Sequence, residues 1–65
     1  MIIVRLIKDL LKQHNKTVGY LARESGLSYE TVADVVNKNI APTPEDAEIM
    51  LGVFGVKLED VLKLY

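Results

Sequence analysis

Apolar residues recur along the chain at spacings of three and four positions, which is the period of an amphipathic helix. This pattern fills five separate segments, and residues that typically end helices lie between them. The predicted helices run from the first residues to Asn15, from Thr17 to Gly26, from Ser28 to Asn37, from Thr43 to Gly55, and onward from about Leu58. The sequence therefore predicts an all-α fold, a compact bundle of about five short helices joined by short loops.

Residues at the predicted helix ends have the chemistry of caps. Thr17, Ser28 and Thr43 each precede an apolar stretch, where a hydroxyl can accept a hydrogen bond from a backbone N–H of the first turn. Asn15 and Gly26 tolerate the left-handed conformation that ends many helices. These signals support the helix boundaries independently of the apolar pattern.

The start of the chain allows a second prediction. Ile2, Ile3 and Val4 are β-branched, and such residues favour strands. A short terminal β pairing with residues 62–65 is therefore left open beside the helical prediction. The same two ends are candidate surfaces for a homodimer, with apolar side chains at Ile2, Ile3, Val4, Leu62, Leu64 and Tyr65.

Length and composition restrict the class of protein. We expect residues 1–65 to form a single domain, which at this size buries only about 60% of the surface of its unfolded chain. The sequence has no cysteine and one histidine, so it offers neither a disulfide framework nor the ligands of a closed zinc site. No nucleophile–base set, apolar run of about 18 residues or signal peptide stands out. We expect a soluble, cytoplasmic protein that is no enzyme and has no cofactor, metal or membrane partner.

Charge is distributed unevenly along the chain. The formal net charge is −1, but residues 1–40 carry six basic against four acidic side chains. Residues 41–65 carry two basic against five acidic ones. The mildly basic first half is compatible with a nucleic-acid partner and equally with a mixed solvated surface.

Residues 17–37 have the spacing of two helices joined by a tight turn, in the sequence TVGYLARESGLSYETVADVVN. The small side chain of Ala22 lets the second helix cross the first closely, and Gly26 supplies the positive φ of a sharp turn. Val32 and Val35 lie where they would hold the second helix against the first. The spacing predicts a helix-turn-helix motif.

This motif resembles that of the phage-repressor and Cro-like (XRE-type) helix-turn-helix family. Asn37 lies where that family usually keeps an asparagine, and Pro42–Glu45 and Phe54–Val61 match its later "P-[ST]-x-E" and "L-G-V-x-L-[DE]-[DE]-L" segments. The match covers roughly residues 6–62 without insertions. The resemblance implies a sequence-specific DNA-binding transcriptional regulator, a homodimer on double-stranded DNA, with the recognition helix at about residues 28–37 in the major groove.

The resemblance also implies site residues. Base edges would be met by Ser28, Tyr29, Glu30 and Asp34. Phosphates would be met at the two neighbouring helix ends, by Thr17, Val18, Asn37, Lys38 and Asn39. The cations expected on this face are Lys12, Lys16, Arg23 and Lys38.

The sequence departs from the family at several of these positions. The family usually has glutamine where Val18 stands, often arginine where Leu11 stands, and a turn glycine where Lys38 stands. Glu30 and Asp34 place two carboxylates in the expected DNA face, where they can accept from cytosine N4 but repel phosphate.

These departures leave alternative functions open. Leu11, Val18 and Tyr29 would form an apolar patch beside the two acidic residues, which suits a basic protein partner. The chain would then be a protein-interaction module that has lost DNA binding. A third possibility is an engineered domain of this fold.

Overall fold

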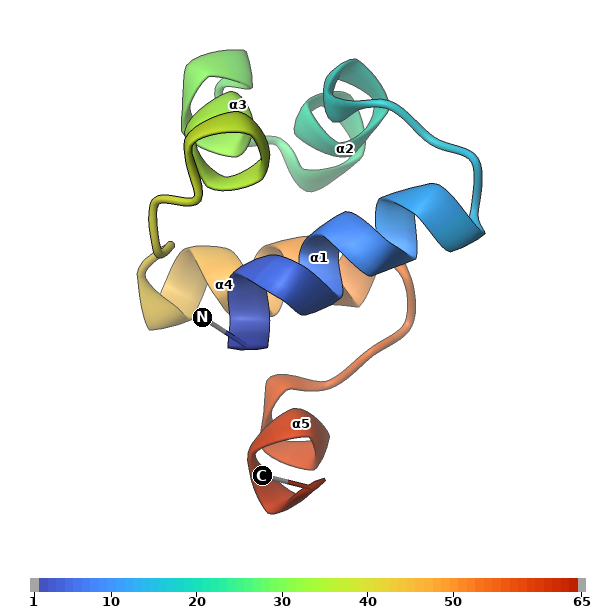
Figure 1. Ribbon diagram of the computed structural model, residues 1–65, viewed down its shortest axis with the longest axis vertical. Coiled ribbons are helices and arrows are strands. Elements are labelled where there is room, and N and C mark those ends of the chain that lie inside the picture. Colours follow the sequence, from blue (N-terminus) through green and yellow to red (C-terminus); the bar gives the residue numbers. More distant parts are fainter. Residues whose placement is uncertain (1, 65) are drawn as a thin grey trace.

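Five α-helices follow one another in this computed structural model, which describes residues 2–64. They are α1 (Ile2–Gln13), α2 (Val18–Ser25), α3 (Tyr29–Lys38), α4 (Pro44–Val53) and α5 (Leu58–Leu64). The described part of the chain contains no strand. Figure 1 shows α2 and α3 at one end of the molecule, α1 and α4 side by side beneath them, and α5 at the opposite end. The all-α prediction with about five short helices is confirmed.

The predicted caps lie at the helix ends. The hydroxyls of Thr17, Ser28 and Thr43 each accept a hydrogen bond from the backbone N–H three residues ahead, at 3.1–3.2 Å. Such a cap stabilises a helix by about 1 kcal/mol. Gly26 ends α2 in the left-handed conformation, with φ at 77°, and its N–H donates to the carbonyl of Ala22. Local side-chain chemistry therefore sets these boundaries.

The terminal β pairing is wrong, because residues 2–4 belong to α1. Val4 is 3% exposed and continues the helical spacing of the buried residues Ile7, Leu10 and Leu11. Burial of this face outweighs the modest helix penalty of β-branched residues. Because it is buried, Val4 is not part of the candidate dimer surface, whereas Ile2 is exposed.

The C-terminal half of the candidate dimer surface lies only partly within the described residues. Leu62 lies in α5 and is 65% exposed, so it remains a candidate for a dimer contact. Tyr65 and the side chain of Leu64, the other two residues of the prediction, lie outside the described residues.

The core lies where α1, α2, α3 and α4 meet, and the buried Val61 of α5 completes it. α2 packs against α3 and α4, and α1 also packs against both of them. The largest fully buried side chains of the core are Ile7, Leu21, Met50, Leu51, Val32 and Val35. Phe54 packs against this core only partly buried, with its ring 5.0 Å from that of His14. The core thus fixes α2 and α3 on each other and leaves their other sides exposed.

Two glycines make the role of the turn testable. A Cβ would meet no atom within 4 Å at Gly26 or at Gly52, but only Gly26 has a positive φ. We expect Gly26→Ala to destabilise the fold by about 1 kcal/mol through backbone strain. The matched control, Gly52→Ala within α4, should stabilise it by about 0.5–1 kcal/mol. Urea unfolding midpoints measure both, and two changes of the same sign would contradict this account of the turn.

Candidate nucleic-acid interface

The helix pair α2–α3 is assembled from small and β-branched contacts. Leu21 and Ala22 on α2 are buried, as are Val32 and Val35 on α3, and Gly26 makes the turn between the helices. These residues form the helix-turn-helix predicted for residues 17–37. Because this face of α3 is buried, its start and its opposite face project from the molecule.

The start of α3 presents one capping residue and two exposed side chains. Ser28 Oγ accepts from the backbone N–H of Thr31 at 3.1 Å and donates to the Thr31 hydroxyl at 2.8 Å. One acceptor position of this oxygen then remains for a ligand. Tyr29 is 62% exposed and Glu30 is also exposed. Tyr29 and Glu30 are therefore better placed than Ser28 to contact a partner.

One turn further along α3, two predicted site residues are paired with each other. Lys38 Nζ lies 3.5 Å from Asp34 Oδ1, and the Asp34 side chain is half-buried. A surface pair of this kind contributes at most about 1 kcal/mol to stability, but it neutralises the lysine locally. Glu30 has no ion-pair partner within the described part of the chain. The surface of α3 consequently carries one unbalanced negative charge from Glu30, Asp34 and Lys38.

The end of α3 explains how the chain tolerates Lys38 in place of the turn glycine. Lys38 is the last helical residue, and the left-handed conformation falls on Asn39 instead, with φ at 56°. Asparagine adopts this conformation more readily than most residues. The Asn39 side chain accepts a hydrogen bond from Lys8 Nζ at 3.0 Å, while Asn37 is exposed. The helix ends one residue later than the family pattern implies.

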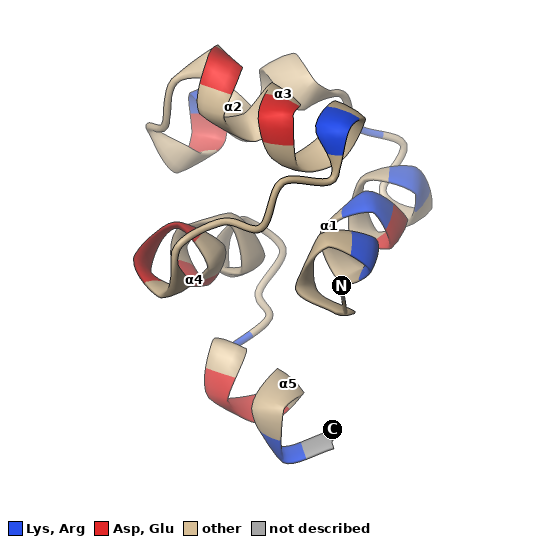
Figure 2. Cartoon of the chain, turned by 60° about the vertical axis from the view of Figure 1, so that its left-hand side comes forward, with Lys and Arg blue, Asp and Glu red and all other residues tan. Residues whose placement is uncertain are grey.

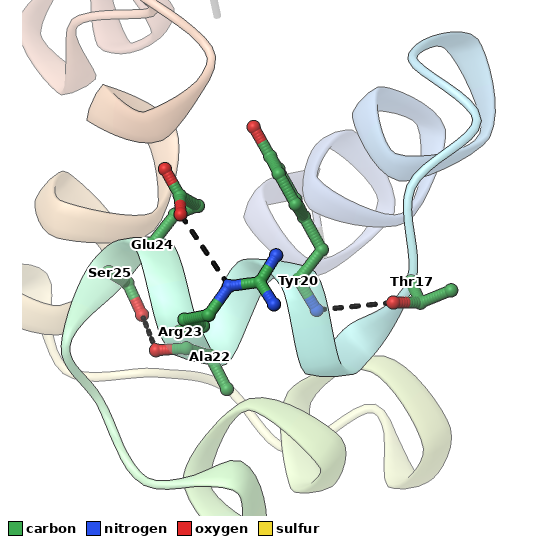
Figure 3. A network of polar contacts seen from close by, with 6 residues as sticks. All are labelled: Thr17, Tyr20, Ala22, Arg23, Glu24 and Ser25. Carbon is green, nitrogen blue, oxygen red and sulfur yellow. Dashed lines mark hydrogen bonds and ion pairs between the residues drawn. The ribbon is translucent and has the colours of Figure 1, made fainter.

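At the start of α2, Thr17 and Val18 have different surroundings. Thr17 Oγ1 accepts from the Tyr20 N–H (Figure 3), which leaves the Thr17 hydroxyl proton available to another acceptor. Val18 is half-buried and packs against the core. The first N–H groups of a helix have no intrahelical partner, so Val18 can offer its backbone here whatever its side chain.

Tyr20 lies among charged side chains on the outer side of α2. Lys16 Nζ is 4.5 Å from the centre of its ring and Arg23 Cζ is 5.9 Å away, distances at which a cation is attracted to the ring face. Figure 3 shows Arg23 also paired with Glu24, at 3.7 Å. Two of the cations expected on the DNA face thus share one aromatic neighbour.

The predicted apolar patch is wrong at Leu11, which is 6% exposed and belongs to the core. The face of α1 that carries Leu10 and Leu11 is turned inward, so the chain has a core residue where the family often has an arginine. With Val18 half-buried, Tyr29 is the one largely exposed residue of the three. A protein partner bound through Leu11 is therefore excluded.

Two contacts go beyond the sequence prediction. One is the Lys8–Asn39 hydrogen bond between α1 and the end of α3, and the other is the placement of Tyr20 beside two cations. The first joins residues 31 positions apart, so no local pattern indicates it. The Arg23–Tyr20 contact follows helical spacing within α2 and could have been expected from it, whereas Lys16 lies before the cap of that helix.

The family model described as helix-turn-helix matches residues 7–61. The chain therefore belongs to the helix-turn-helix family of the phage-repressor and Cro-like (XRE) type, whose members are DNA-binding regulators. Comparisons with curated proteins and with solved structures found no match. Within residues 2–64, no helix is long and apolar enough to cross a membrane.

The cap at Ser28 can be tested apart from DNA binding. Ser28→Ala removes the acceptor for the Thr31 N–H and should destabilise the fold by about 1 kcal/mol, whereas Ser28→Asn retains a capping oxygen and should cost little. Urea unfolding of the two variants beside the parent protein gives the comparison. An alanine variant as stable as the parent would show that this hydroxyl does not cap α3.

Proposed function

We propose that this protein is a sequence-specific DNA-binding transcriptional regulator of the repressor or Cro type, which inserts α3 into the major groove. The observation that carries the proposal is the complete helix-turn-helix within the family match, with the start of α3 exposed. In this motif the second helix meets base edges while the first lies across the DNA backbone. Residues 1–65 act as one domain and by binding alone, without catalysis or a cofactor.

Base reading falls to side chains of α3 that are exposed or half-buried. Tyr29 and Glu30 lie at its start, and Asp34 lies one turn further on. A carboxylate only accepts hydrogen bonds, so Glu30 selects amino groups, chiefly cytosine N4. Asp34 does the same when Lys38 leaves it to contact a phosphate.

Phosphate contacts position the helix. The backbone N–H groups at the start of α2, together with the Thr17 hydroxyl, provide donors beside one strand. Asn37, Lys38 and Asn39 provide them at the end of α3, where all three side chains are exposed. These contacts set the orientation of the protein and carry no sequence information themselves.

A homodimer would let the protein read two half-sites. The domain measures 29 × 21 × 18 Å, and two copies on adjacent half-sites would need to hold their α3 helices about 34 Å apart. Ile2 and Leu62 are exposed apolar residues that a dimer contact would cover. Sedimentation equilibrium at two concentrations measures the oligomeric state.

The carboxylates of α3 give the sharpest test of base reading. A duplex selected from a random pool and a random-sequence duplex are compared at low salt by fluorescence anisotropy. Glu30→Gln should cost about 1–3 kcal/mol of discrimination between them. It should also strengthen binding to the random duplex, because a charge that repels phosphate is removed. The matched control, Glu48→Gln on α4, replaces an exposed carboxylate outside α3 and should change neither affinity.

Failure of the folded parent protein to bind any duplex at high micromolar concentration would overturn the proposal. That result would favour a protein-interaction module, in which exposed Tyr29 and the net negative charge of α3 serve a basic protein partner. Unchanged discrimination in Glu30→Gln, with binding retained, would remove Glu30 from the base-reading set.

A further inference from the structure

Helix α1 carries three basic side chains in a row. Arg5, Lys8 and Lys12 are separated by three and four residues, so they share one face of the helix, and all three are exposed. We call them the α1 basic row. Asp9 is the one acidic residue of α1, so the helix as a whole is positively charged.

The row begins beside the end of α3. Lys8 Nζ donates to the side chain of Asn39, and Arg5, Lys8 and Asn39 line one shallow groove together with Val4 and Asp9. Lys38, the neighbour of Asn39, is exposed at the same helix end. The row is therefore continuous with a region that the proposed function assigns to phosphate.

The row ends close to the start of α2. Two residues, His14 and Asn15, follow α1 before Lys16. The Lys16 N–H donates to the carbonyl of Leu11 at 2.8 Å, and Thr17 then caps α2. The row consequently connects both helix ends proposed to contact phosphates. Figure 2 shows the basic segments of α1 and of the end of α3 on one side of the molecule.

The charge of the remaining surface makes this row significant. α3 itself carries an unbalanced negative charge, and acidic residues fill the first turns of α4 and α5. Attraction to a polyanion must therefore come from outside the recognition helix. Among the described residues, neither Arg5 nor Lys12 has an ion-pair partner, so both charges are available.

We propose that the α1 basic row binds the phosphate backbone that borders the groove occupied by α3. This inference rests on the proposed function. Arg5 and Lys8 would add two phosphate contacts to the four expected from Lys12, Lys16, Arg23 and Lys38. Each phosphate contact contributes about −0.9 to the slope of log affinity against log salt concentration. The slope for one domain would then be about −5.4, compared with about −3.6 without Arg5 and Lys8.

The test measures this slope for the parent protein and for Arg5→Gln and Lys12→Gln on the selected and random duplexes. Glutamine is a good helix former, so both variants should keep the fold, which circular dichroism verifies. Each should reduce the magnitude of the slope by about 0.9 and weaken binding to the two duplexes by the same factor. The controls are Lys57→Gln, just before α5, and Lys63→Gln, on α5. Both replace exposed lysines outside the row and should leave the slope unchanged.

The outcomes separate this inference from the proposed function. DNA binding by the parent with an unchanged slope in Arg5→Gln and Lys12→Gln would overturn the α1 basic row alone. An equal decrease of the salt slope in Lys57→Gln would also overturn the α1 basic row, because it would show a general effect of net charge. Weaker binding to the selected duplex alone would assign Arg5 and Lys12 to base reading instead. Absence of binding by the parent would overturn the proposed function and this inference with it.

Discussion

The close packing of α2 against α3 is the constraint on which the rest of the structure depends. Ala22 lets the two helices approach, Val32 and Val35 fill the contact, and the positive φ of Gly26 gives the chain the sharp turn between them. Burying this side of α3 leaves its opposite face exposed. The same contact therefore stabilises the small domain and creates the surface that the family uses on DNA.

Electrostatics distinguish this chain from the pattern of its family. The recognition helix carries Glu30 and a neutral Asp34–Lys38 pair, while the family's arginine on α1 is replaced by the buried Leu11. Positive charge is carried instead by the exposed side of α1 and by the residues around the start of α2. Under the proposed function, this arrangement would separate attraction to the DNA backbone from reading of the bases, since different helices would supply the two.

Most of the fold could be predicted from the sequence because its signals are local. The caps at Thr17, Ser28 and Thr43 and the left-handed turn at Gly26 each depend on a few neighbouring residues. The site was harder to predict. Ser28 uses most of its hydrogen-bonding capacity on Thr31 at the start of α3. The family pattern predicts a turn residue at Lys38, whereas Asn39 adopts the left-handed conformation. A shift of a single residue in the position where a helix begins or ends changes such details.

The sequence by itself determined the five helices, their ends and the helix-turn-helix, because apolar period, caps and turn residues act over short distances. Only the tertiary structure decided which sides of α1 face inward and outward. It buried Val4 and Leu11, which the sequence allowed as surface residues, and it brought Lys8 to Asn39. The physical reason is that a helix has several partly apolar faces, and the one that becomes buried depends on the helices packed against it.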